Sequence, residues 1–217
     1  MDERNLNGVQ APRLSGPVDS TTERILAATL QVYTEAGYRG TTTRRIAQEA
    51  GVNEITLFRQ FGTKEALVKA ALSRTYQEVS PVELADPLDP EAELYEWAIS
   101  TYLHWYAGRH LISKVLSDLV EHPELAPDIC EEPGCKHAML SGYLDRLRER
   151  GLATGEFYSD AAAGMLLGSV FSHAIWRDHF GKPDLPPTEE VVRQYVKLLL
   201  ASVGFRPAAA RGRKDKA

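Results

Sequence analysis

The chain has 217 residues, of which 43% are hydrophobic and 25% charged, and its formal net charge is −5. This composition is typical of a globular protein and excludes a disordered or fibrous chain, and no stretch is long and apolar enough to cross a bilayer. Residues 1–20 have mixed charge and no apolar run, which excludes a secretory signal and predicts a cytoplasmic protein without a membrane partner.

Charge is divided unevenly along the chain. Residues 20–75 contain 8 Lys or Arg against 5 Asp or Glu, a net charge of +3, whereas residues 76–206 contain 11 against 21, a net charge of −10. A basic segment attached to an acidic one suits a small nucleic-acid reader joined to a larger body. The negative charge of the whole chain therefore does not argue against DNA binding.

Helix-capping residues and glycines divide the first part of the chain into short helices. Ser20 and Glu23 form a capping box before an apolar run at helical spacing, and Gly37 and Gly51 each end a helix. These signals predict four helices, over residues 20–37, 44–50, 54–60 and 64–79.

Helical periodicity also dominates the rest of the chain, and no alternating strand pattern occurs. The expected further helices cover residues 94–106, 111–120, 134–150, 160–180 and 189–203. The sequence therefore predicts an all-α fold with about nine helices.

Residues 43–61 have the spacing of a helix-turn-helix, because two short helices are separated by a three-residue turn. Ala47 keeps the first helix thin where the second crosses it, and Gly51 supplies the positive φ that turns the chain. Val52 and Leu57 fill the space between the helices, and Phe61 also turns inward. The exposed start of the second helix would then point at base edges in a major groove.

Two kinds of DNA contact are expected from these helices. Threonines at a helix start can hold a phosphate through free amides, and nearby basic side chains displace counterions. The expected phosphate contacts are Thr42, Thr43, Arg44, Arg59 and Lys64. The expected base readers are Asn53, Glu54, Ile55 and Thr56, among which Ile55 suits a thymine methyl group.

Two segments, TTTRRIAQEAGV at residues 41–52 and TLFRQFGTKEAL at residues 56–67, resemble the signature of the TetR family of bacterial transcriptional regulators. The resemblance covers residues 22–72. It implies a three-helix DNA-binding domain at residues 20–66 and a larger helical ligand-binding and dimerisation domain at residues 67–206. A disordered leader at residues 1–19 and a disordered basic tail at residues 207–217 complete the expected organisation.

The chain departs from the family pattern at two positions of the recognition helix. Phe58 stands where the family usually has a tyrosine, so one hydroxyl contact to a phosphate is missing from this DNA-binding position. Glu54 replaces a frequent basic or small residue, which is unfavourable near DNA unless it accepts from a cytosine amino group.

The partners implied by the resemblance are double-stranded operator DNA and a second copy of the chain. Two recognition helices about 34 Å apart can occupy successive major grooves. Small residues and an apolar stripe on the last two helices favour a four-helix interface there, with an intrachain core as the alternative. The expected interface residues are Gly164, Gly168, Phe171, Val192, Val196, Leu199, Leu200 and Val203.

The second part of the chain is rich in aromatic residues, which either pack in the core or line a ligand cavity. A cavity of this kind suits an apolar or aromatic small effector that weakens DNA binding. The expected lining residues are Trp97, Tyr102, Trp105, Tyr106, His137, Tyr143, Met165, Phe171, His173 and Trp176.

No cofactor, metal or catalytic site is expected. The spacing of Cys130 and Cys135 is not that of a zinc knuckle, and the charged residues between them, Glu131 and Glu132, are acidic and do not activate a thiol. The sequence leaves three interpretations open: a ligand-responsive repressor, a DNA-binding protein without an effector, and a helical enzyme or interaction module with an incidental motif. Repression follows only the family default, because an activator would have the same features.

Overall fold

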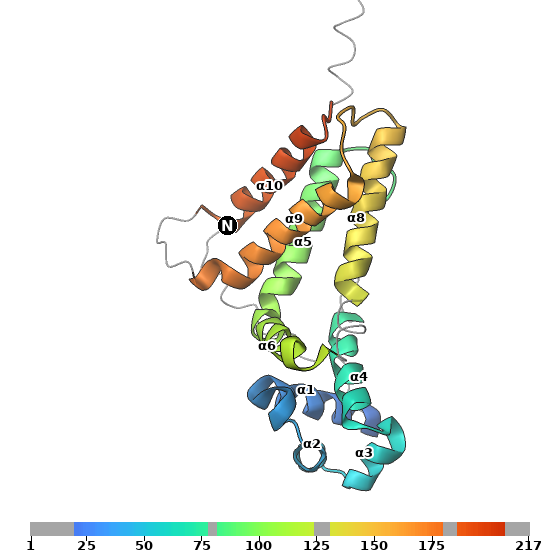
Figure 1. The fold of residues 1–217 in the computed structure, drawn as a ribbon, viewed down its shortest axis with the longest axis vertical. Helices are drawn as coiled ribbons and strands as arrows, with labels where there is room; N and C mark the ends of the chain where they lie inside the picture. Colours follow the sequence, from blue (N-terminus) through green and yellow to red (C-terminus); the bar gives the residue numbers. More distant parts are fainter. Residues whose placement is uncertain (1–19, 78–81, 124–130, 180–185, 207–217) are drawn as a thin grey trace, which may run out of the picture. The chain divides into compact units, whose positions relative to one another are not determined.

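A computed structural model of the protein describes residues 20–77, 82–123, 131–179 and 186–206. In these ranges the chain forms nine α-helices, a short 3₁₀-helix and an isolated bridge between Ala153 and Phe205 (Figure 1). This confirms the predicted all-α fold. The first helices are α1 (Thr21–Gly40), α2 (Thr43–Ala50), α3 (Glu54–Phe61) and α4 (Lys64–Gln77). The others are α5 (Pro90–Ala107), α6 (Arg109–Glu121), α8 (Glu131–Glu149), α9 (Ser159–Trp176), the 3₁₀-helix (Arg177–His179) and α10 (Thr188–Ser202).

Helix α1 starts and kinks at Ser20 and Gly37, the two residues from which the sequence predicts its start and its end. Ser20 caps α1, since its hydroxyl accepts a hydrogen bond from the Glu23 amide at 3.1 Å. The helical backbone of α1 is interrupted at Gly37, whose positive φ of 67° suits a residue without a Cβ. One further turn follows, so the predicted helix end appears as a kink. Two predicted helix ends, Val79 and Phe180, lie outside the described residues.

Contacts divide the chain into two compact units. The first unit combines residues 1–80 with 107–132, and within it α1 packs against α2, α4 and α6. The second unit combines residues 81–106 with 133–217. The predicted domain boundaries remain a prediction, because compactness alone does not show which segment carries which function.

The core of the first unit forms where α1 meets the helices of the turn motif. Ile25, Ile46, Leu57 and Leu67 are at most 1% exposed and belong to one buried cluster, and Phe61 packs against it. Leu57 and Phe61 therefore both turn inward, as their spacing of four residues predicts. Truncation of a buried leucine such as Leu57 typically destabilises a protein by about 2–5 kcal/mol. Because Leu57 belongs to α3, its burial in this cluster holds α3 against the other helices.

The packing of α10 in the second unit corrects part of the predicted dimer interface. The expected stripe on this helix is at most 5% exposed in the single chain: Val192, Val196, Leu199, Leu200 and Val203. Side chains with so little accessible surface cannot be covered by a second copy, so the stripe is intrachain core, and α9 packs directly against α10. On α9, Gly164 and Gly168 are exposed. The partly buried ring of Phe171 instead packs edge-on against Trp105, with the ring centres 5.2 Å apart.

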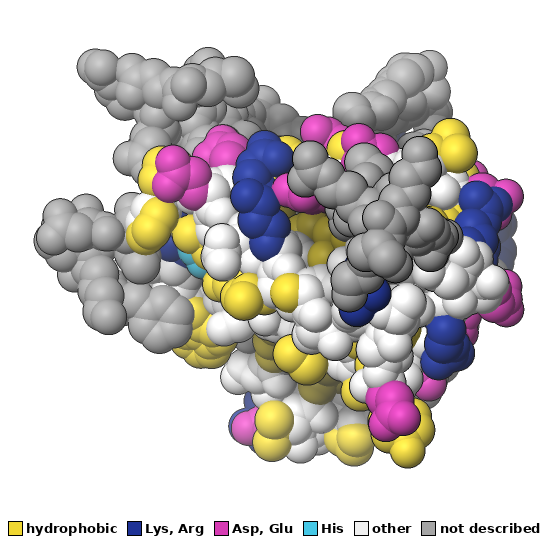
Figure 2. All heavy atoms as spheres, turned by 90° about the horizontal axis from the view of Figure 1, so that it is seen from above, with side chains coloured by type: hydrophobic (Ala, Val, Ile, Leu, Met, Phe, Trp, Pro, Cys, Tyr) yellow, Lys and Arg dark blue, Asp and Glu magenta, His cyan; other side chains and the backbone are white. Residues whose placement is uncertain are grey.

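Exposed hydrophobic side chains are spread among charged ones on the face drawn in Figure 2. Single exposed apolar residues are normal on globular proteins. A functional surface is therefore better sought where several such residues share one side of a helix.

Some sequence-based expectations concern residues that the structure does not describe. These are the leader at residues 1–19, the tail at residues 207–217 and Cys130, whereas Cys135 is described and exposed. Within the described ranges, no helix combines the length and apolar character needed to span a membrane. In the same ranges no three His, Cys, Asp or Glu side chains gather in a way that could hold a metal ion.

Candidate nucleic-acid interface

A tight three-residue turn joins α2 and α3. Gly51 ends α2 with φ 65° and ψ 39°, and the Val52 amide donates to the Ala47 carbonyl at 3.0 Å. This glycine cap satisfies carbonyl groups at the helix end. Asn53 then caps α3, because its side-chain oxygen accepts from the Ile55 amide at 2.9 Å. The predicted helix-turn-helix is therefore present in the structure.

The start of α2 has the features of a phosphate site. Thr42 is exposed, and its hydroxyl caps the helix by accepting from the Arg45 amide at 3.2 Å. The amides of Thr43 and Arg44 belong to the first helical turn, where backbone N–H groups point out of the positive end of the helix. The Thr43 hydroxyl is engaged differently, since it donates to the Glu54 carboxylate of α3. A phosphate at this point would therefore be held mainly by backbone amides.

The expected base readers lie at the start of α3. Ile55 is 73% exposed and Asn53 is also exposed, whereas Glu54 and Thr56 are partly exposed. The hydrogen bond from Thr43 turns the Glu54 carboxylate towards α2. Ile55 is thus the most prominent apolar side chain at this end of the helix.

The outward side of α3 continues with an aromatic and a basic side chain. Phe58 is 50% exposed and Arg59 is exposed, whereas the intervening Leu57 is 1% exposed. Arg44 on α2 is exposed as well. The charges of both arginines are therefore accessible to a phosphate, while Arg45 forms an ion pair with Glu35 of α1.

Lys64 has intrachain partners in the structure. Its ammonium donates to the Tyr38 carbonyl at 2.8 Å and lies 3.9 Å from the centre of the Tyr38 ring. A cation over an aromatic face, with a carbonyl acceptor beside it, is held by intrachain contacts. Lys64 therefore joins the start of α4 to the end of α1, and its expected phosphate contact remains a prediction.

Tyr38 itself was missed by the sequence analysis, although a large aromatic residue directly after a helix-ending glycine was a possible signal. It is 4% exposed, and its hydroxyl donates to Glu65 Oε1 at 2.9 Å. Its amide donates to Asp118 Oδ2 at 2.9 Å, and its ring centre lies 4.3 Å from that of His122. The backbone amide of Glu65 and the Tyr38 hydroxyl together lower the pKa of the Glu65 carboxyl. Tyr38 therefore connects α1, α4 and α6.

The second unit buries several of the expected effector-pocket residues. Four of them are at most 4% exposed: Trp97, Tyr102, Trp105 and Tyr143. The ring of Tyr102 stacks on Tyr106 with the centres 5.6 Å apart and lies 5.3 Å from His173. Burial raises the pKa of the Tyr102 phenol.

Tyr102, Tyr106 and Tyr195 form an aromatic cluster around the imidazole of His173. His173 is 9% exposed, and among the described residues its buried Nε2 atom has no hydrogen-bond partner. Burial, with the nearby positive charge of Arg177, lowers the pKa of the imidazole below its ordinary value of 6.5. The ring is therefore neutral at pH 7 and offers a hydrogen-bonding atom inside an apolar surrounding.

Four of the expected pocket residues have other positions or partners. Met165 is 64% exposed and Trp176 is 50% exposed, so neither lines an enclosed pocket, and the prediction for both is corrected. The Nε2 atom of His137 lies 3.0 Å from the Asp160 carbonyl oxygen, which links α8 to α9. The Tyr143 hydroxyl donates to Glu93 Oε2 on α5 at 2.5 Å.

Comparison with known proteins agrees with this geometry. Residues 25–71 match the family described as "Bacterial regulatory proteins, tetR family". The uncharacterized HTH-type transcriptional regulator YvkB of Bacillus subtilis (strain 168) is 29% identical over 84% of this chain and 97% of its own length.

Solved structures show the same fold. A TetR-family regulator structure from Mesorhizobium loti superposes with a TM-score of 0.69 at 21% identity, covering 88% of this chain and all of the other. The Flavonoid-responsive Regulator FrrA superposes with a TM-score of 0.68 at 23% identity, covering 86% and 98%. The helix-turn-helix on α2 and α3, the family match over residues 25–71 and the similarity to an HTH-type regulator over 84% of this chain assign the chain to the TetR family of DNA-binding transcriptional regulators, which are not enzymes.

Proposed function

We propose that this regulator is a homodimeric repressor that leaves its operator when an apolar or aromatic small molecule binds. The DNA-binding part of this proposal rests on α3, where Ile55 and Phe58 are exposed although Leu57, which lies between them in the sequence, is buried. We propose double-stranded operator DNA as the partner and, because bacterial DNA lies in the cytoplasm, a cytoplasmic location for the protein. An activator would use the same DNA-binding surface, so the choice of repression over activation follows the usual behaviour of the family.

In this proposal α3 enters the major groove by its N-terminal end. Asn53, Ile55 and Thr56 face base edges, and Ile55 packs against a thymine methyl group. Glu54 joins these readers only when its carboxylate releases the Thr43 hydroxyl. The α2 start holds a phosphate through the Thr43 and Arg44 amides beside Thr42, and the Arg44 and Arg59 side chains add charge. Phe58 contributes apolar contact to the DNA backbone in place of a hydroxyl.

A dimer places two recognition helices in successive grooves. We assign the contact surface to the exposed side of α9, where Gly164 and Gly168 permit close approach and Met165 and Trp176 supply apolar area. Counted from Gly168, the other three residues lie three, four or eight positions away, which puts them on one side of the helix. Leu198 of α10, which is 58% exposed, extends the surface.

The effector part rests on the aromatic cluster around His173. A neutral imidazole with an unsatisfied nitrogen at an apolar site suits a ligand that combines a ring with one hydrogen-bonding group. FrrA, which has the same fold, is a flavonoid-responsive regulator. The alternative, a DNA-binding regulator without an effector, is favoured by the close packing of Phe171 against Trp105, which fills space beside the cluster with side chains.

Selection of bound sequences from a random DNA pool tests the DNA-reading part, and an inverted repeat is the expected result. Light scattering then gives the mass of the free protein and of its complex. A panel of flavonoids titrated against the selected duplex tests the effector. The proposal is supported if a flavonoid releases the protein from the duplex and His173→Phe abolishes this release. If no compound releases the protein, the alternative without an effector is supported. A monomeric protein that does not bind duplex DNA would contradict both.

A further inference from the structure

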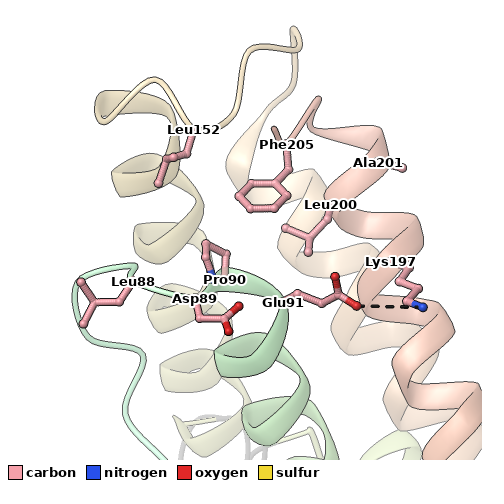
Figure 3. A pocket seen from close by; sticks show the side chains of 9 residues that line it. All are labelled: Leu88, Asp89, Pro90, Glu91, Leu152, Lys197, Leu200, Ala201 and Phe205. Carbon is pink, nitrogen blue, oxygen red and sulfur yellow. Dashed lines mark ion pairs between the residues drawn. The ribbon is translucent and has the colours of Figure 1, made fainter. Parts of the chain in front are cut away.

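We propose that the second unit has a binding site for an apolar ammonium compound, located between the start of α5 and the end of α10. The structure has a cavity of about 390 Å³ there (Figure 3). This volume lies within the range of about 300–1,000 Å³ found for small-molecule pockets. None of its lining residues belongs to the aromatic cluster around His173, so the site is separate from the proposed effector site.

The floor and walls of the cavity are apolar. Pro90 and Leu200 are buried, and Leu152 and Phe205 are partly buried. In Figure 3 the Phe205 ring lies between Leu152 on one side and Leu200 of α10 on the other. A hydrocarbon or aromatic body of a ligand would find contact on several sides here.

The backbone fixes the aromatic wall. The Phe205 amide donates to the Leu200 carbonyl at 2.9 Å, and Phe205 forms a β-bridge with Ala153. Beside it the chain crosses itself at two glycines, where a Cβ on Gly204 would lie 2.7 Å from the Gly155 nitrogen. Phe205 is therefore held in position before any ligand binds, which reduces the entropy lost on binding.

The rim of the cavity favours a cation. Its charged side chains are Asp89, Glu91 and Lys197, and all three are exposed. Lys197 Nζ lies 4.0 Å from Glu91 Oε1, and an exposed ion pair at this distance is weak. An ammonium group can therefore replace Lys197 beside Glu91. Two carboxylates, the face of Phe205 and the negative end of α10 attract positive charge, whereas Lys197 and the positive end of α5 at Pro90 oppose it. The two full negative charges of Asp89 and Glu91 exceed the one full positive charge of Lys197, so the lining residues favour a cation.

The inference concerns binding only and does not depend on the proposed repressor function. It is tested with the full-length protein and two probes that share one apolar body, 4-butylbenzylammonium and 4-butylbenzoate, by isothermal titration calorimetry at pH 7. We expect the ammonium probe to bind more tightly than the benzoate. Glu91→Gln should weaken the binding of the ammonium probe by about three- to fivefold, the effect of losing one exposed ion pair. The matched control is Glu96→Gln, a change of an exposed glutamate on the same helix outside the cavity, which should leave affinity unchanged.

A second variant tests the location of the site. Ala201 lines the cavity and is exposed, so Ala201→Trp can place a large side chain at its mouth without disturbing the core. This change should abolish binding while the circular-dichroism melting curve stays unchanged. Unchanged affinity in Ala201→Trp would overturn the location, and equal or tighter binding of the benzoate would overturn the charge assignment. No binding of either probe would overturn the whole inference.

Discussion

The Tyr38 amide donates a hydrogen bond at 2.9 Å to Asp118, a residue 80 positions further along the chain. The Gly37 and Tyr38 carbonyls in turn accept from the Thr41 amide at 3.1 and 3.3 Å, and the next residue, Thr42, caps α2. Asp118 therefore holds the segment from which α2 starts. By these contacts α6 is a structural part of the unit that carries the helix-turn-helix.

Replacement of Asp118 by alanine should leave the Tyr38 amide without its acceptor. We expect a loss of about 1.5–3 kcal/mol in the free energy of unfolding, the usual value for a hydrogen bond to a charged group, together with weaker DNA binding. Urea denaturation and fluorescence anisotropy with a selected duplex measure the two effects. Asp118→Asn is the control, because it keeps an acceptor oxygen. Equal behaviour of the two variants would contradict the role of this contact.

Arg44 and Arg59 are expected to act through phosphates. Each change to alanine should weaken binding to all duplexes alike and reduce the slope of log K against log salt by about 1. Lys64→Ala should instead lower stability and leave the salt slope unchanged, because its ammonium is bound to Tyr38. Binding measured between low and moderate salt separates these outcomes. A reduced slope in Lys64→Ala would instead support the predicted phosphate contact of Lys64.

Changes at the start of α3 should alter sequence preference rather than general affinity. Ile55→Ala removes the proposed thymine contact, so discrimination at one base pair of each half-site should fall by about 1–3 kcal/mol. Thr56→Ala should shift preference at a neighbouring position. Repeating the selection with each variant shows which positions relax. A motif identical to that of the unaltered protein in both cases would remove these residues from the list of base readers.

The dimer proposal separates two sets of residues on α9 and α10. Met165→Arg places a charge on the exposed side of α9 and should yield a folded monomer with weak operator binding. Leu199→Ala, at a position 4% exposed within the chain, should lower the free energy of unfolding by about 2–5 kcal/mol. Light scattering and chemical denaturation distinguish these effects. Dissociation in Leu199→Ala at full stability would favour the stripe first predicted for α10.

His173 should make stability depend on pH. Its folded-state pKa lies below the ordinary 6.5, so as pH falls below 6.5 the unfolded chain binds a proton that the folded chain refuses. Stability should therefore decrease from pH 7 towards pH 5, by at most about 1.4 kcal/mol per pH unit for one proton. His173→Gln should remove this contribution. Denaturation curves at several pH values test it, and an identical slope in the variant would show that other groups cause the dependence.

Helix positions were predictable because their signals are local. Ser20, Gly37 and Gly51 act through backbone conformation and capping within a few residues, and the structure uses each of them at or within one turn of the expected place. The same holds for the inward side of α3, which follows from the spacing of Leu57 and Phe61.

Other features depend on contacts that local signals do not encode. An apolar stripe such as Val192 and Val196 can be buried either in an intrachain core or in a dimer interface. Sequence periodicity alone cannot distinguish these two environments. Lys64 looks like any exposed cation until Tyr38 is placed beside it. The hydrogen bond from Tyr38 to Asp118 joins elements far apart in sequence, and no pattern in either segment indicates it.

The cap at Asn53 limits how this residue can read a base. Recognition of adenine by an asparagine side chain uses the amide oxygen and nitrogen together, both aimed at the same base edge. In this chain the oxygen already faces the Ile55 amide, 2.9 Å away inside the helix start. Only the NH₂ group remains to point outward. The NH₂ group of Asn53 can donate to acceptors such as guanine O6 and N7 or thymine O4. The paired contact to adenine requires the side-chain oxygen as well, and therefore requires that the hydrogen bond to the Ile55 amide be broken.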